Sequence, residues 1–524
     1  MRWPSLILEA WSIYRSLLRV RPLDLCSLIL GIGKINMLLP RTVKPKTSVV
    51  GLALHLKPIT LRGLVSKNTS AGKTSSLIEG DISSTLKRMT IPMILGMIMM
   101  MSFGLIDTFF VSLLGTEQLA AISFTFPVTF TVISLNIGLG IGTSAIIGRL
   151  QGSNDLTLSQ HYATGSLMLS AILVGSLACV GYFTIELVFS MLNAPVLLMP
   201  YIYDYMGLWY LSSVFLSLPM VGNSVLRACG DTRTPSVVMA SVGGINAILD
   251  PVFIFGFGPV PAMGIQGAAL ATLLAWCVGA FWILYLLAVQ RKLMLPRLLS
   301  FTELKASSSE ILRIGLPAAG ANMLTPIAGG VMTAVVAAYG PAAVAAWGVG
   351  NRLESIASIL VLALSMTLPP FISQNVGANK IDRVKRAYSL TLKFVLFWQF
   401  TVFVIMWVLS TWIGAAFAKE PEVSALIQLF LMIVPLGYGM QGIIILTNSS
   451  LNAMHRPMSA LALSVIRLFV FLVPISVAAS YLYGLKGLFW GTVIANIAMA
   501  CVSVVVFQRA ITQFDASDVH NEHK

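Results

Sequence analysis

The most constraining feature of the sequence is a series of apolar runs, each longer than the roughly 18 residues that mark a transmembrane helix candidate. A run of this length crosses roughly 30 Å of hydrocarbon when it forms a helix. Hydrophobic residues make up 57% of the 524-residue chain and charged residues only 10%, whereas soluble proteins carry about a quarter charged residues. The chain is therefore predicted to be an all-α membrane protein that crosses the bilayer many times.

Glycine, proline and charged residues divide the apolar sequence into twelve predicted transmembrane spans. These spans cover residues 89–114, 119–148, 159–183, 199–225, 233–258, 264–290, 310–338, 343–372, 384–411, 423–449, 457–483 and 485–510. One side of the spans holds sixteen Lys and Arg residues, whereas the other side holds only Lys419 and Lys486. Because basic loops stay in the cytoplasm, we expect both termini to be cytoplasmic and this multi-pass protein to lie in the cell inner (plasma) membrane.

The formal net charge of +14 is concentrated at the start of the chain. Residues 1–75 hold 12 basic residues against Glu9 and Asp24, a net of +10, which leaves +4 for the rest of the chain. We therefore expect no nucleic-acid partner. The basic extension fits an over-called translation start, a disordered or membrane-surface tail, or a targeting segment, and these three interpretations stay open.

The second half of the chain repeats the first half. The pairs matched by one constant offset in residue number include Arg88 and Arg313, Pro92 and Pro317, Gly104 and Gly329, Gly115 and Gly340, and Asn154 and Asn379. Near the end of each half, a slightly smaller offset matches Gly264 with Gly484 and Thr272 with Thr492. Because six spans separate the copies, the halves share one orientation and are related by a pseudo-two-fold axis along the membrane normal.

This repeat predicts two six-helix lobes that face each other across a cleft. The N-lobe, with spans 1–6, covers residues 76–290, and a cytoplasmic linker covers 291–309. The C-lobe, with spans 7–12, covers residues 310–512. Residues 1–75 form the N-terminal extension, and residues 513–524 form a cytoplasmic tail.

Two carboxylates lie deep within predicted spans, where a charge costs about 2.5–3.5 kcal/mol. A rise of about 1.5 Å per residue places Asp107 about 27 Å and Asp250 about 26 Å from the cytoplasmic ends of their helices. Asn246 lies one helical turn before Asp250, and Thr272 of span 6 reaches a compatible depth. We expect these four side chains to form a site that couples transport to a shared proton or, as the alternative, to Na⁺.

The second half of the chain lacks these carboxylates. At the repeat positions, Met332 corresponds to Asp107 and Val470 corresponds to Asp250. The ion chemistry is therefore predicted to lie in the N-lobe only. Glu354, in span 8, is interpreted as an interhelical anchor.

Other residues are candidates for the substrate cleft or for conformational change. Met97, Met100 and Met101 in span 1 fit ordinary packing, and they also fit a permissive site for apolar cations. Arg467, in the middle of span 11, is a further candidate for the substrate cleft. Pro92 frees a backbone carbonyl and creates a bending point about four turns before the aspartate of span 1.

Six short segments keep a specific order and spacing along the chain. They are Leu86–Pro92, Gly104–Asp107, Gly138–Gly142, Arg227–Pro235, Asn246–Pro251 and Gly264–Thr272. Together they resemble the multidrug and toxic compound extrusion (MATE) transporters, and within them the DinF-like prokaryotic branch. The resemblance extends over roughly residues 76–512.

The resemblance implies export of organic, often cationic compounds by antiport with protons or Na⁺, through alternating access of the two lobes. It implies ion coupling at Asp107, Asn246, Asp250 and Thr272, and helix bending at Pro92. Protonation would then neutralise the N-lobe pocket, weaken its attraction for a cationic substrate and rearrange span 1.

The sequence departs from the family in two places. The sodium-coupled NorM-like branch has a glutamate in span 7, where this chain has Thr325, so a second cation site is not expected in the C-lobe. The long N-terminal extension is also atypical.

Two alternatives to a multidrug efflux transporter have different sequence requirements. A lipid-linked precursor flippase of related architecture would need a cationic cleft in place of paired aspartates. An intramembrane aspartyl protease would need a Gly-x-Gly-Asp motif, and this chain has only Gly104 before Asp107. We expect no enzymatic activity and no cofactor besides the coupling ion. The expected partners of a monomeric protein are small organic substrates and membrane lipid.

Overall fold

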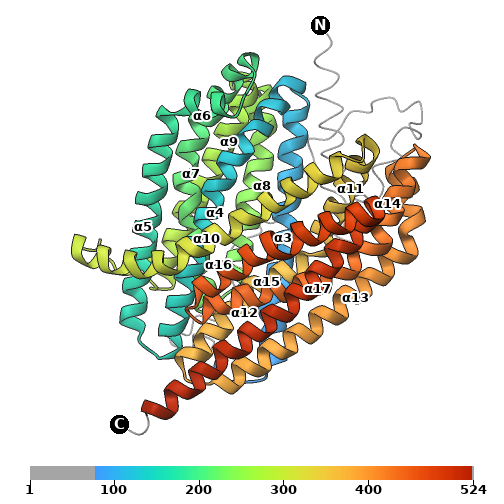
Figure 1. Cartoon of the computed structure of the whole chain (residues 1–524). Helices are drawn as coiled ribbons and strands as arrows, with labels where there is room; N and C mark the ends of the chain where they lie inside the picture. Colours follow the sequence, from blue (N-terminus) through green and yellow to red (C-terminus); the bar gives the residue numbers. More distant parts are fainter. Residues whose placement is uncertain (1–76, 522–524) are drawn as a thin grey trace, which may run out of the picture.

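The computed structural model describes residues 77–521, which form two groups of packed helices (Figure 1). The first group, the N-lobe, contains α3 (Ile82–Ser112), α4 (Thr116–Gly152), α5 (Leu156–Phe183), α6 (Ile185–Met191), α7 (Met199–Ala228), α8 (Arg233–Phe255) and α9 (Gly264–Tyr285). The second group, the C-lobe, contains α10 (Phe301–Ala337), α11 (Pro341–Ala357), α12 (Ile359–Gly377), α13 (Ile381–Phe417), α14 (Pro421–Ile433), α15 (Tyr438–Ala453), α16 (Pro457–Ile466) and α17 (Val473–Asn521). The predicted extension 1–75 lies outside the described residues.

The helices account for the twelve predicted spans. Eleven stretches of the described chain are long and apolar enough to cross a membrane. The last of them, Pro457–Gln513, contains two predicted spans because the backbone leaves the helical conformation at Tyr483 and Gly484. Span 8 consists of α11 and α12 in succession, and span 10 consists of α14 and α15 joined by the 3-10 turn Val434–Gly437. The predicted all-α fold with twelve spans in two lobes is confirmed.

The internal repeat is also present in the backbone conformation. Positive φ angles occur at three pairs of matched positions: Gly115 and Gly340 (138° and 94°), Asn154 and Asn379 (61° and 56°), and Gly264 and Gly484 (56° and 62°). This region of φ is rare for residues other than glycine and asparagine. The repeat therefore reproduces the turns between helices as well as the helices themselves.

The two lobes meet closely along α4, which packs against α10 and α12. Glycines make this approach possible because they bring no side chain to the contact. A Cβ atom at Gly138 would collide with the carbonyl oxygen of Gly315, and one at Gly152 would collide with the carbonyl oxygen of Gln374. The Gln374 side chain also crosses the junction, where its Nε2 donates to the carbonyl oxygen of Ala228 at 2.7 Å.

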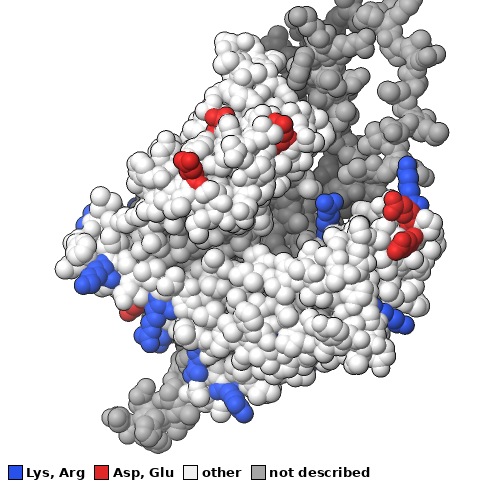
Figure 2. Space-filling model, turned by 45° about the horizontal axis from the view of Figure 1, so that its top comes forward, with Lys and Arg blue, Asp and Glu red and all other residues white. Residues whose placement is uncertain are grey.

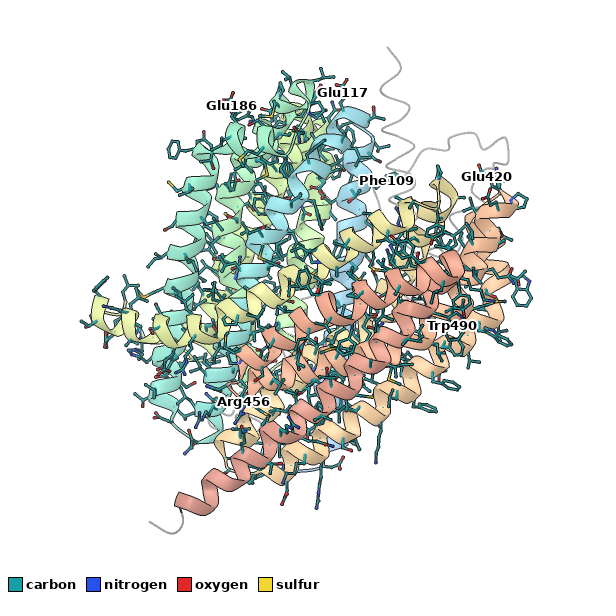
Figure 3. All side chains as sticks on the ribbon, viewed as in Figure 1. Phe109, Glu117, Glu186, Glu420, Arg456 and Trp490 are labelled. Atoms are coloured by element: carbon teal, nitrogen blue, oxygen red, sulfur yellow. The ribbon has the colours of Figure 1, made fainter. Side chains whose placement is uncertain are left out.

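Charged residues are separated between the two ends of the bundle. Glu117 and Glu186 lie at one end of the N-lobe, and Arg456 lies at the opposite end of the molecule (Figure 3). The space-filling view shows acidic side chains on the upper lobe and most of the basic ones below it (Figure 2). We call the end that holds Arg149, Arg313 and Arg456 the basic end.

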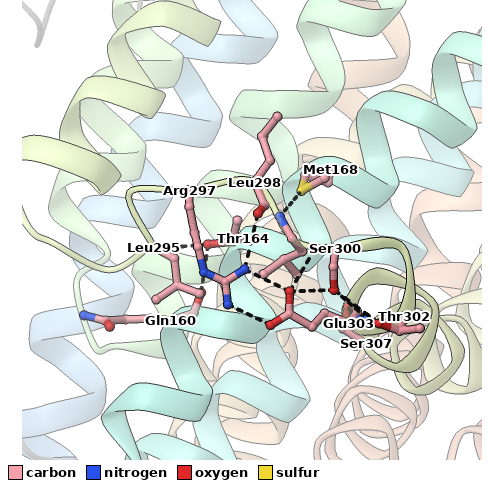
Figure 4. A network of polar contacts seen from close by, with 11 residues as sticks. Gln160, Thr164, Met168, Leu295, Arg297, Leu298, Ser300, Thr302, Glu303 and Ser307 are labelled. Atoms are coloured by element: carbon pink, nitrogen blue, oxygen red, sulfur yellow. Dashed lines mark hydrogen bonds and ion pairs between the residues drawn. The ribbon is translucent and has the colours of Figure 1, made fainter.

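The connection between the lobes is attached to α5 by a polar network (Figure 4). The Leu295 amide donates to Thr164 Oγ1 of α5 at 2.9 Å, and Arg297 forms an ion pair with Glu303 at 2.7 Å. Ser300 caps α10 in a reciprocal capping box with Glu303, which satisfies amide groups that the first helical turn leaves free. This cap starts α10 at Phe301, so the helix extends into the predicted linker 291–309.

The contact between α4 and α10 yields a test of the junction. Replacing Gly138 with alanine should lower the stability of the purified protein by about 1–3 kcal/mol, because the new methyl group must displace packed backbone. The measurement is the apparent melting temperature in detergent. Gly329→Ala is the matched control, since a Cβ there meets nothing within 4 Å; equal melting of the two variants would contradict this packing.

Candidate functional site

Two carboxyl groups meet where α3 packs along α8. Asp250 is fully buried, and Asp107 is partly buried. The side chains of Asp107 and Asp250 are within hydrogen-bonding contact of each other. Two carboxylates this close cannot both stay ionised in a poorly solvated site, so the arrangement favours one shared proton.

The close packing of α3 on α8 brings these groups together. A Cβ at Gly96 of α3 would lie 2.8 Å from Ser236 Cβ of α8, so the glycine allows the two helices to approach. Pro251 lies inside α8 directly after Asp250. Because proline has no amide hydrogen, it leaves the carbonyl group four residues earlier, that of Ala247, without its helical donor. The site therefore lies at a locally weakened stretch of helix.

An amide and a hydroxyl group extend the site across three helices. Asn246 Nδ2 donates to Asp250 Oδ1 at 3.1 Å and lies 3.4 Å from Thr272 Oγ1 of α9. The second oxygen of Asp250, Oδ2, is buried and accepts no hydrogen bond from the described residues. A bound proton would satisfy that oxygen. The structure thus brings together all four residues that the sequence analysis selected.

Tyr205 of α7 lies near this site, although its sequence position did not point to it. It lies close enough to Asp107 and Asp250 to interact electrostatically with both carboxyl groups. Nothing in the local sequence distinguishes it from the other twelve tyrosines of the chain. Only the packing of α7 beside α8 and α9 reveals its place.

The remaining candidates in span 1 lie along α3. Pro92 lies within this helix, which continues without interruption from Ile82 to Ser112. Met97 is half-buried, whereas Met100 and Met101 are exposed. The three methionines therefore do not form one buried patch with the acidic pair.

The C-lobe has no carboxylate at the positions matched to the acidic pair. Met332 is buried and Val470 is exposed. A different polar cluster lies elsewhere in this lobe.

This second cluster joins α11, α15, the π-helical turn Arg467–Leu472 and α17. Gln441 Nε2 donates to Glu354 Oε1 at 2.9 Å, so Glu354 links two helices. Arg467 Nη2 lies 3.4 Å from Asn496 Oδ1, and its buried Nε has no hydrogen-bond partner among the described residues. The charged members were visible as charges within spans, whereas Gln441 and Asn496 gave no sequence signal.

The oxygen-rich N-lobe site is chemically suited to a proton or to Na⁺. Carboxylate, amide and hydroxyl oxygens are also ligands for hard cations. Within residues 77–521, His, Cys, Asp and Glu side chains do not gather in groups of three or more that could hold a metal ion. The donor set consists of two carboxyl groups, one amide and one hydroxyl group.

Comparison with protein families gives a match in each lobe. The family model described as MatE matches residues 92–252 and 317–478. The two matches begin at Pro92 and Pro317, which are themselves a matched pair of the internal repeat. The family pattern therefore follows the duplication.

Individual relatives match over nearly their whole length. The chain is 40% identical over 433 residues to the "FAD transporter" of Shewanella oneidensis, covering 83% of this chain and 96% of that protein. It is 27% identical over 446 residues to the "Probable multidrug resistance protein YpnP" of Bacillus subtilis, covering 83% of this chain and 97% of that protein.

Comparison with solved structures points to the same family. The MATE transporter VcmN of Vibrio cholerae, in the bent form, superposes with a TM-score of 0.79 at 33% identity, covering 84% of this chain and 99% of that chain. Members of this family are transporters, so the protease alternative is excluded and the protein is not an enzyme. The chain belongs to the multidrug and toxic compound extrusion family of multi-pass membrane transporters.

Proposed function

We propose that the protein exports organic compounds by antiport with protons and that Asp107, Asn246, Asp250 and Thr272 form the coupling site. The observation that carries this proposal is the contact between a fully buried carboxyl group and a second one on a neighbouring helix. A shared proton neutralises such a pair, and its loss leaves a negative charge in an apolar lobe. A proton and a cationic substrate therefore compete for this negative charge, so binding of one weakens binding of the other.

Helix α3 connects this charge change to the lobe junction. It carries Asp107 in the N-lobe, and its Thr90 Oγ1 lies 3.0 Å from Thr367 Oγ1 of α12 in the C-lobe. Pro92 lies between these two points and lacks the amide that would stiffen the helix. Protonation of Asp107 shifts α3 toward one shape only if the proton binds more tightly in that shape than in the other. Bending at Pro92 would move the contact with α12.

We propose that the basic end faces the cytoplasm and that the membrane is the cell inner (plasma) membrane. The excess of Lys and Arg at that end supports this orientation. On this proposal the molecule acts as a monomer, with substrate and lipid as its partners and with the coupling ion as its only cofactor. The hollow visible between the lobes in Figure 2 is the proposed substrate path. The paired aspartates favour an efflux transporter over a flippase, which would need a cationic cleft.

A flavin dinucleotide is the second candidate substrate. The relative matched over 96% of its length is named a FAD transporter, and FAD carries an anionic pyrophosphate. Arg467, with an unpartnered Nε among the described residues, offers a guanidinium group of the kind that pairs with phosphate oxygens. The paired aspartates favour cationic substrates, and other relatives are named multidrug export proteins.

The acidic pair is tested by replacing one carboxyl group with an amide. Asp107→Asn should lower proton-driven efflux from membrane vesicles at least about tenfold, because the proton can no longer be released. The protein should remain folded, since the amide keeps the size and polarity of the carboxyl group. Asp204→Asn, an exposed carboxylate of α7, is the control and should transport normally. Normal efflux by Asp107→Asn would defeat the proposed coupling site.

The identity of the coupling ion is tested in proteoliposomes that contain the purified full chain. We expect efflux of a cationic dye under a pH gradient at zero Na⁺ gradient, and no efflux under a Na⁺ gradient when the pH is equal on both sides. The opposite result would assign coupling to Na⁺ at the same four side chains.

The variant Arg467→Gln distinguishes transport of a flavin dinucleotide from transport of a cationic compound. If flavin dinucleotides are transported, this variant should reduce FAD transport at least about tenfold, because a charge-assisted contact to phosphate is lost. Transport of a cationic dye should change less than about twofold, since the acidic pair is intact. Equal loss of both activities, measured in the same proteoliposomes, would indicate a structural role for Arg467.

A further inference from the structure

A pocket of about 480 Å³ lies between the lobes at the basic end, away from the acidic pair. The N-lobe contributes α4 and α5 to its wall, and the C-lobe contributes α10 and the start of α16. Its polar and charged lining consists of Arg149, Tyr162, Glu310, Arg313 and His455. None of these residues belongs to the proposed coupling site.

Two hydrogen bonds close the lobes around this pocket. Tyr162 Oη of the N-lobe donates to Glu310 Oε2 of the C-lobe at 2.5 Å. His455 Nε2, from the loop before α16, donates to the carbonyl oxygen of Ala145 in α4 at 3.3 Å. The pocket therefore exists in this form only while the lobes are together at the basic end.

The charge around the pocket is predominantly positive. Arg149 comes from one lobe and Arg313 from the other, and neither forms an ion pair with the described acidic residues. Glu310 is the only carboxylate in the lining, and it already accepts from Tyr162. Burial lowers the pKa of His455 and the charge of Arg149 lowers it further, whereas the hydrogen bond to Ala145 and the charge of Glu310 raise it, and Arg313 adds a smaller lowering. Both arginines are exposed side chains that line the same pocket.

We propose that this pocket binds an anionic phosphate group between Arg149 and Arg313. The guanidinium group presents parallel N–H donors that match phosphate oxygens. An anion held by both arginines would relieve the repulsion between them and would bridge the lobes. Such a bridge stabilises the conformation in which the basic end is closed. The phosphate belongs either to the headgroup of an anionic phospholipid or to a soluble phosphate compound.

The first arm of the test uses inorganic phosphate on the full-length protein in detergent. Phosphate should raise the apparent melting temperature saturably, with ionic strength held constant by chloride. In Arg149→Gln/Arg313→Gln the apparent dissociation constant should rise at least about tenfold, because two charge-assisted contacts are lost. The single variants should show intermediate values and provide the comparison if the double variant does not fold.

The second arm uses phosphatidylglycerol on delipidated protein, with bound lipid counted by native mass spectrometry. Binding by the wild type that falls at least about tenfold in the double variant would identify a lipid headgroup as the source of the phosphate. Phosphatidylcholine, which has no net charge, should show no such dependence on the two arginines.

Arg88→Gln is the matched control in both arms. Arg88 occupies the position in α3 that the internal repeat pairs with Arg313 in α10, and it is exposed at the start of its helix and outside the pocket. The Arg88→Gln substitution removes the same charge as Arg313→Gln does, but from the N-lobe. It should leave the affinities for phosphate and for phosphatidylglycerol within about twofold of the wild type. The proposal is overturned if the Arg149 and Arg313 variants bind phosphate and phosphatidylglycerol as Arg88→Gln does.

Discussion

The contact between Asp107 and Asp250 is the interaction on which the proposed mechanism depends. Two acidic groups in an apolar lobe are stable together when a proton lies between them and when neighbouring dipoles offset the remaining cost. Asn246 and Thr272 provide those dipoles from α8 and α9. The charge of such a site changes when a proton binds or leaves. The backbone of the N-lobe is otherwise arranged like that of the C-lobe.

The two lobes share a plan but differ in chemistry. Matched turns with positive φ show that the repeat extends to loop geometry, whereas the acidic pair occurs in one lobe and a mixed Glu354 and Arg467 cluster occurs in the other. Glycine contacts hold α4 against α10, and α3 reaches the C-lobe through Thr90. On the proposed mechanism, α3 would carry a charge change in the N-lobe to the junction, and the pocket beside Arg149 lies on that same junction.

Much of this organisation was predictable because membrane insertion imposes simple rules on sequence. A span needs about twenty apolar residues, and a deep carboxylate is costly, so Asp107 and Asp250 stood out and their depths could be compared from helix rise alone. Asn246 was found through its spacing to Asp250. Tyr205, Gln441 and Asn496 were not found, because uncharged polar side chains are common in spans and carry no positional signal.

The sequence by itself determined the membrane class, the twelve spans, the duplication and the family, because each follows from local hydropathy or from motifs in register. Only the tertiary structure decided which side chains touch. Helix rotation and crossing depend on small residues such as Gly96 and Gly138, which admit neighbours from distant parts of the chain. Contacts between α3 and α8, and between Tyr162 and Glu310 across the lobes, therefore depend on three-dimensional packing that no local pattern encodes.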